Sequence, residues 1–145
     1  MASRRVTDML YVVQSHVHEF LSKCENEGIN VLIYCTKRER SEQEAEYAKG
    51  RTKPGKIVTY APPGCSFHEY GVAFDHVPIL NGRLVWEDGL TPEEEKLWTR
   101  CGEIAESCGF TWGGRWAGRK RDMPHCQYTQ GMTIQDFIAG KRPTA

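Results

Sequence analysis

Four side chains of the kinds that bind metal or carry protons occur at spacings that could form a hydrolytic metal site. They are His68, Asp75 and His125, together with Asp122, which lies three residues before the last of them. Two imidazoles and one carboxylate are a typical set of three protein ligands for catalytic zinc, whose fourth position is left for water. A further carboxylate near the ligands can serve as the general base. The pattern therefore predicts zinc-assisted hydrolysis.

The sequence around these residues resembles a known family. It reads Ser-x-His-x-x-Gly-x-Ala-x-Asp over residues 66–75 and Asp-x-Pro-His over residues 122–125. This combination is similar to that of the zinc D-Ala-D-Ala carboxypeptidases of the VanX and VanY kind, a family that includes the phage L-alanyl-D-glutamate endopeptidases. Residues 50–59 and 110–116 also resemble the endopeptidase branch. The resemblance extends from about Val31 to His125.

This resemblance implies a fold and an activity. The fold would be α+β, a single domain with helices packed on a mainly antiparallel sheet and a zinc cleft, as in the hedgehog and D-Ala-D-Ala peptidases. The activity would be peptidoglycan hydrolysis at the L-Ala–D-Glu bond of the stem peptide, as in phage endolysins that lyse the host. A D-Ala-D-Ala carboxypeptidase or dipeptidase would share the zinc site. A non-catalytic zinc-binding relative that acts as a binding module is a further alternative, against which the retained Asp122 argues.

The resemblance also implies roles for individual residues. Asp122 would take a proton from the attacking water and return it to the leaving amine, unless it merely pairs with a neighbouring arginine. Arg38 precedes Gln43 by five residues, as an arginine does in the family, and would stabilise the oxyanion; Arg40 is a competing choice. Ser66 either binds a substrate carbonyl or carboxylate or is a turn residue.

Several other candidates are expected to lie outside the metal site. The side chain of His76 should point to the opposite face of its strand from Asp75, and Cys65 and Cys126 should point away from the metal site although they lie near His68 and His125 in the sequence. A basic cluster should form a solvated loop or meet an anionic polymer of the cell wall. Its members are Arg115, Arg119, Lys120 and Arg121.

Length and composition limit the remaining possibilities. The 145 residues carry no net charge, which argues against a nucleic-acid partner bound through bulk charge. They predict one catalytic domain over 1–145, a monomer, without a separate wall-binding domain. No apolar run reaches the length of a membrane span, and the N-terminus lacks the pattern of a signal peptide. We therefore expect synthesis in the host cytoplasm, reduced thiols, and access to the wall through a holin-like partner.

Periodicity and turn residues predict the elements that would position the site. Apolar spacing predicts a helix over about 5–27, a Glu- and Ala-rich stretch predicts one over 41–49, and a Thr-Pro-Glu-Glu start predicts one over 91–107. A short final helix is expected over 133–139. Runs of β-branched and apolar residues predict strands over 29–35, 74–80 and 83–86, and extended segments over 57–60 and 125–128. Asn81-Gly82 should form a hairpin turn. The segment that carries His68 is expected to be extended, with a kink at Gly71.

Overall fold

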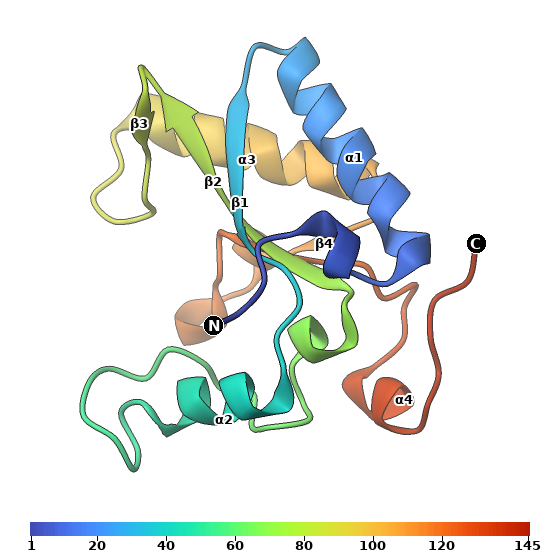
Figure 1. Ribbon diagram of the computed structural model, residues 1–145. Coiled ribbons are helices and arrows are strands. Elements are labelled where there is room, and N and C mark those ends of the chain that lie inside the picture. Colours follow the sequence, from blue (N-terminus) through green and yellow to red (C-terminus); the bar gives the residue numbers. More distant parts are fainter.

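The computed structural model describes residues 1–145, and its architecture is helices packed on a small antiparallel sheet (Figure 1). The helices are α1 (Tyr11–Asn26), α2 (Arg40–Ala48), α3 (Pro92–Ser107) and α4 (Ile134–Ile138). The strands are β1 (Asn30–Cys35), β2 (Ala73–Leu80), β3 (Arg83–Leu84), β4 (Thr111–Trp112) and β5 (His125–Gln127). Four 3-10 helices complete the chain: Val6–Asp8, Phe67–Tyr70, Gly113–Arg115 and Gly118–Lys120.

The sheet has the order β1-β2-β5-β4, with β3 paired to β2, and every pairing is antiparallel. This confirms the predicted fold class. The long strand β2 is central, because it pairs with β1, β3 and β5. Residues of β2 and β5 that are fifty or more positions apart in the sequence are thereby brought into register at the middle of the sheet.

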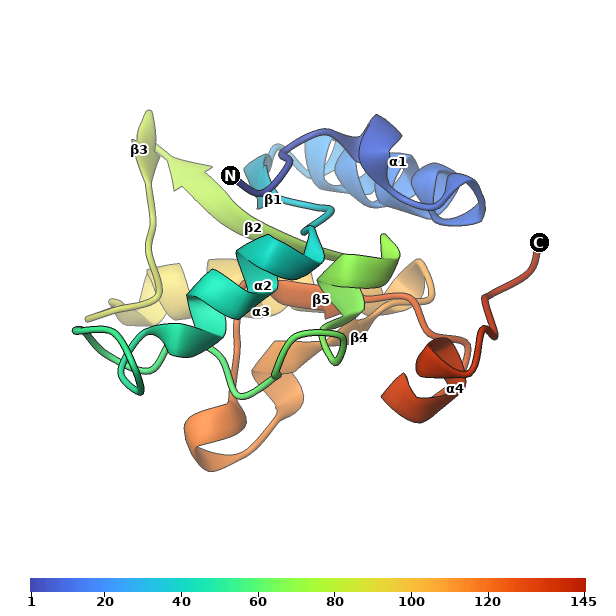
Figure 2. The same cartoon turned by 60° about the horizontal axis from the view of Figure 1, so that its bottom comes forward.

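One face of the sheet is covered by α1 and α3, while α2 and the segment after it lie at a different edge of the molecule (Figures 1 and 2). The main core lies under α1 and α3 and includes the fully buried Phe20 of α1 and Phe74 of β2. Burial of one such side chain contributes about 1.5–3 kcal/mol. These two helices therefore fix β2, and with it any residue on the opposite face of that strand.

Local sequence signals set the ends of several elements. Helix α3 begins with a reciprocal cap, in which Thr91 Oγ1 accepts from Glu94 N (3.2 Å) and Glu94 Oε1 accepts from Thr91 N (2.9 Å). The hairpin between β2 and β3 turns through Asn81 and Gly82, both with positive φ. Both features agree with the sequence-based expectations.

One expectation for secondary structure was wrong. His68 lies on the 3-10 helix Phe67–Tyr70 instead of in an extended segment. Residues 57–60, expected to be extended, join no strand pair and lie exposed, apart from a half-buried Thr59. None of the helices is long and apolar enough to span a lipid bilayer.

Candidate metal centre and cleft

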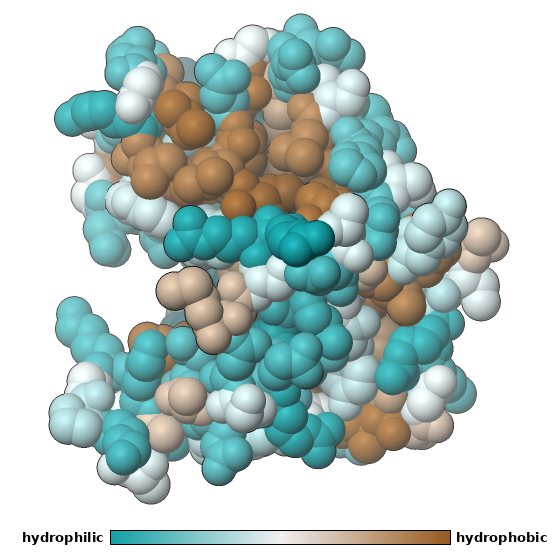
Figure 3. All heavy atoms as spheres, in the orientation of Figure 1, coloured by the Kyte–Doolittle hydropathy of each residue, from teal (hydrophilic) through white to brown (hydrophobic).

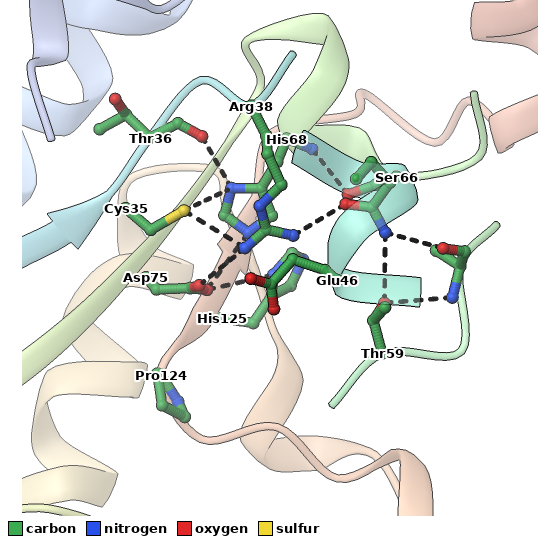
Figure 4. A network of polar contacts seen from close by, with 12 residues as sticks. Cys35, Thr36, Arg38, Glu46, Thr59, Ser66, His68, Asp75, Pro124 and His125 are labelled. Carbon is green, nitrogen blue, oxygen red and sulfur yellow. Dashed lines mark hydrogen bonds and ion pairs between the residues drawn. The ribbon is translucent and has the colours of Figure 1, made fainter. Parts of the chain in front are cut away.

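The structure brings the three predicted ligands to one point (Figure 4). Oδ1 of Asp75 lies 3.3 Å from Nε2 of His68 and 3.5 Å from Nδ1 of His125. The two imidazole rings are 5.1 Å apart and nearly perpendicular. All three side chains are largely withdrawn from solvent. The arrangement leaves three potential ligand atoms facing one another in a protected position.

His68 is positioned by the short 3-10 helix that carries it. Ser66 caps this helix, since its Oγ accepts from His68 N at 3.3 Å. The carboxylate of Glu69 accepts from Ser66 N (3.1 Å) and Gly64 N (2.8 Å), which closes a capping box. Gly71 then ends the helix in the left-handed conformation, where any Cβ would meet Leu10 N at 2.8 Å. These local bonds hold the His68 backbone against the start of β2.

Asp75 and His125 are positioned by the sheet, since they face each other in the register of β2 and β5. Neighbouring residues of a strand point to opposite faces, so His76 enters the core between Phe20 and Trp98. The expectation that His76 points away from the metal site is thus met by the geometry.

The outer nitrogen of each proposed histidine ligand is already engaged. Nδ1 of His68 is 2.8 Å from the carbonyl oxygen of Thr36, and Nε2 of His125 is 2.8 Å from Oε1 of Gln127. Both partners are acceptors, so these nitrogens donate, and the inner nitrogens are the ones left to offer a lone pair to a cation. The buried Oδ1 of Asp75 has no hydrogen-bond partner. Three converging acceptors of this kind fit a cation, and such outer hydrogen bonds are typical of metal-bound histidines.

The pKa values of His68 and Asp75 also indicate a site that favours a cation. Burial alone would lower the pKa of His68, but the carboxylate of Asp75 raises that pKa to about 10. Burial would raise the pKa of Asp75, yet His68 and His125 hold it well below its usual range. Without a metal ion, the inner nitrogen of His68 would therefore carry a proton beside the ionised carboxylate, and a bound metal cation would replace that proton.

Cys35 is a donor near this centre that the sequence analysis did not single out. With His68 and Asp75 it forms a group whose donor atoms lie within 4.8 Å of one another. Its Sγ, however, lies 3.7 Å from Nδ1 of His68, the nitrogen that donates to Thr36, and accepts from Arg38 Nη2 at 3.4 Å. We therefore favour His125 over Cys35 as the third ligand.

The structure distinguishes the two candidate arginines. Arg38 is 15% exposed, donates to Gln43 Oε1 at 2.9 Å, and places Nη2 4.0 Å from Oδ2 of Asp75. Arg40 is 70% exposed and lies instead by Glu69, with 3.7 Å between Nε and Oε2. Only Arg38 lines the same cleft as the metal centre. The five-residue offset between Arg38 and Gln43 thus corresponds to a hydrogen bond, which Arg38 makes with the buried side chain of Gln43 on α2.

The segment that carries Asp122 is held by four hydrogen bonds that anchor its backbone. Asp122 N donates to Gly113 O (3.0 Å), and the indole of Trp112 donates to Met123 O (2.7 Å). The carbonyl of Pro124 accepts from both the backbone N (3.0 Å) and Nδ1 (2.7 Å) of His76. This is a positional role for Trp112 and His76 that no local sequence signal marks.

Asp122 itself lies in the cleft with an exposed side chain. Desolvation by the walls raises its pKa from the ordinary value, while His125 opposes that rise. A carboxylate of this kind is a better proton acceptor than a fully hydrated one. No arginine pairs with it, which removes the alternative considered from the sequence.

The centre opens into a cleft of about 1040 Å³. One wall is the extended segment after α2, with exposed Ile57, Val58 and Tyr60. Another wall contains Trp116, whose ring packs 5.5 Å from that of His125, and the basic segment 119–121. Figure 3 shows the hollow between the β3 region and the segment that follows α2. This volume is at the upper end of the range for small-molecule pockets, which leaves space for a substrate of several residues.

The remaining candidates are placed as follows. Cys126 is fully buried in the core, whereas Cys65 is half-buried at the edge of the cleft. Arg115 faces away from the cleft and forms a two-bond ion pair with Glu106, at 2.9 and 3.0 Å. The buried, fully engaged carboxylate of Glu69 is unavailable as a base.

Comparisons with known proteins identify the family and the relatives of the chain. A family model described as D-alanyl-D-alanine carboxypeptidase matches residues 60–128. Peptidoglycan L-alanyl-D-glutamate endopeptidase CwlK of Bacillus subtilis (strain 168) is 37% identical over 125 residues, covering 83% of this chain and 74% of CwlK. The L-alanyl-D-glutamate peptidase of Listeria phage A118 is 31% identical over 110 residues, covering 76% of this chain but 34% of the phage protein.

A solved structure shares the fold. The Serratia marcescens L-Ala D-Glu endopeptidase ChiX superposes with a TM-score of 0.63 at 16% identity, over 95% of this chain and 92% of ChiX. At that identity the likeness concerns the arrangement of helices and strands alone.

Proposed function

The chain belongs to the D-alanyl-D-alanine carboxypeptidase family of metallopeptidases, and from this premise we propose that it is a zinc-dependent peptidoglycan hydrolase that cleaves the L-Ala–D-Glu bond of the stem peptide. The observation that carries the proposal is the convergence of His68 Nε2, His125 Nδ1 and the unpartnered Oδ1 of Asp75 beside a carboxylate in an open cleft. Two nitrogens and one oxygen suit zinc with an open fourth position. The names of CwlK and of the phage A118 relative support the choice of bond.

The residues of the cleft would have separate roles in hydrolysis. Zinc held by His68, Asp75 and His125 would supply a Lewis acid and lower the pKa of its water toward about 7. Asp122 would take a proton from the water that attacks the L-Ala carbonyl, and would deliver a proton to the departing D-Glu nitrogen. Arg38, held in place by Gln43, stabilises the negative charge that develops on the carbonyl oxygen. Ser66 primarily caps the His68 helix, and we propose that its hydroxyl also meets a substrate carbonyl.

Digestion of purified peptidoglycan tests the proposed bond. The full chain loaded with zinc should release peptides with a new N-terminal D-glutamate, identified by mass spectrometry of the soluble products. The variant Asp122→Asn serves as the matched control for contaminating hydrolases. Release of C-terminal D-alanine instead would favour the carboxypeptidase alternative. A folded, zinc-loaded protein that releases no product would favour a binding module.

A role in host lysis is a finer proposal, supported by the phage relative. We propose that the 145 residues suffice for hydrolysis as a monomer, because all the proposed ligands and the base come from one chain. Action on the wall would then need a holin-like partner to open the membrane. Cells that express the chain in the cytoplasm should lyse only after their membrane is permeabilised. Lysis without permeabilisation would contradict the need for such a partner.

A further inference from the structure

Three cations lie together along one wall of the cleft. Arg119, Lys120 and Arg121 occupy the short 3-10 helix Gly118–Lys120 and the residue after it, within the orange segment of Figure 2. All three side chains are exposed and line the same cleft as the metal centre. The triplet immediately precedes Asp122. Because consecutive Cα atoms are about 3.8 Å apart, the Cα of Arg119 is at most about 11 Å from that of Asp122.

These charges are not used by the fold. Arg119 and Lys120 form no hydrogen bond or ion pair through their side chains, and Arg121 donates only to the Gly114 carbonyl, at 3.2 Å from Nε. Arg115, from the same basic cluster, is by contrast paired with Glu106 outside the cleft. Free cations that face a cleft are available to an anionic ligand.

The acidic side chains of the cleft leave room for such a ligand. Glu46 is paired with Lys49 at 3.1 Å, and Asp75 faces the two histidines. Exposed Glu87 and the proposed base Asp122 also line the cleft without an ion-pair partner, so they compete for the cations. The three cations outnumber these two free acids, and the wall that they form keeps a net positive charge.

The proposed reaction gives this wall a specific neighbour, and the inference rests on that proposed function. When the L-Ala–D-Glu amide breaks, the departing nitrogen belongs to the glutamate, and Asp122 is the residue that protonates it. A glutamate has two carboxyl groups, one of which continues the stem peptide while the other is free. That free carboxylate is only a few covalent bonds from the departing nitrogen. It must therefore lie on the Asp122 side of the scissile bond, where the triplet is.

We propose that Arg119, Lys120 and Arg121 bind the free carboxylate of the D-glutamate residue and make the enzyme select stem peptides in which this group is not amidated. Guanidinium groups match the planar geometry of a carboxylate and form charge-assisted hydrogen bonds with it. An amide at this position carries no charge and offers one acceptor oxygen fewer. The cations thus distinguish two substrates that differ in one functional group.

A pair of synthetic stem peptides tests this selection. One has a free D-glutamate carboxylate and the other has the corresponding amide, and kcat/KM is measured for each with the zinc-loaded full chain. Since the cations are exposed and screened by salt, we expect the wild-type enzyme to favour the carboxylate by about fivefold to tenfold. Combined replacement Arg119→Gln and Lys120→Gln should bring the ratio close to one. The ratio should also fall as salt is added.

Arg115→Gln is the matched control, because it removes one positive charge from the same cluster but outside the cleft. It should leave the substrate ratio unchanged. Equal cleavage of both peptides by the wild type would overturn the inference while leaving the proposed function intact. An equal loss on both peptides in the double variant would also overturn it, since the cations would then act on something other than this carboxylate. Failure of the wild type to cleave either peptide would refute the proposed function and the inference together.

Discussion

Replacing Gly113 by alanine should lower turnover by moving Asp122. A Cβ built on Gly113 would lie 2.3 Å from the carbonyl oxygen of Asp122, and contacts under 3.0 Å essentially never occur. The two backbones must therefore separate by about 0.7 Å. Asp122 N donates to Gly113 O, so the displacement reaches the proposed base directly. A misplacement on the order of 1 Å can cost about 10²-fold, and we expect kcat/KM to fall between about tenfold and hundredfold.

The assay for Gly113→Ala combines kcat/KM on a stem peptide, zinc content by elemental analysis and thermal unfolding. Zinc content separates a displaced base from a displaced ligand, because the Asp122 carbonyl also accepts from His125 N at 3.2 Å. Gly28→Ala is the control, since its Cβ would meet no atom within 4 Å and Gly28 follows the end of α1. It should cost stability through its positive φ but little turnover. A folded, zinc-loaded Gly113→Ala enzyme with normal kcat/KM would refute the argument that this close contact positions Asp122.

Three further predictions concern the base, the ligand set and acid stability. Asp122→Asn should keep zinc and fold while losing about 10²–10⁴-fold in turnover; near-normal kcat/KM would show that it is not the base. His125→Ala should lose zinc, whereas Cys35→Ser should keep one zinc per chain by elemental analysis; the reverse result would replace His125 by Cys35 in the ligand set. His76 is buried and neutral, and burial lowers its pKa to about 4 from 6.5. The unfolded chain therefore binds this proton at a higher pH than the folded chain does. The free energy of unfolding should fall by about 3 kcal/mol as the pH drops from 6.5 to about 4, and it should not change through His76 above pH 6.5. Urea unfolding of the metal-free protein should show this loss, and His76→Phe should lack it.

The parts of the fold that the sequence predicted are those set by local chemistry. The reciprocal cap of Thr91 and Glu94, with Pro92 at the first helical position, marks the start of α3 within a residue of its observed place. The Asn81-Gly82 turn similarly fixes the β2–β3 hairpin. In each case the signal and the structure lie within a few residues of each other, so no knowledge of the tertiary fold was needed.

The segments that line the cleft were predicted less completely. Ile57–Tyr60 has the composition of a strand, but a strand needs a partner, and these residues lie unpaired beside the open cleft. The Ser66–Glu69 capping box was present in the sequence as a Ser-x-x-Glu pattern and would have predicted the helical turn at His68. The resemblance to the family supplied the identity of the site residues, whereas their geometry came from the pairing of β2 with β5.

A bulge in β1 explains why Cys35 could not be foreseen. Ile33 pairs with His76 and Cys35 pairs with Asp75, so two steps along β1 stand against one step along β2, and Tyr34 is the extra residue. Bulges next to active sites redirect side chains. Here the bulge sets Cys35 opposite Asp75. Its Sγ thereby comes within 3.7 Å of Nδ1 of His68, although the two residues are 33 positions apart in the sequence. Cys65 and Cys126 lie nearer to the proposed histidine ligands in the sequence, but neither belongs to the group of donor atoms around His68 and Asp75. The register of β1 on β2, which no pattern within residues 33–35 encodes, therefore determines which thiol can compete for the metal.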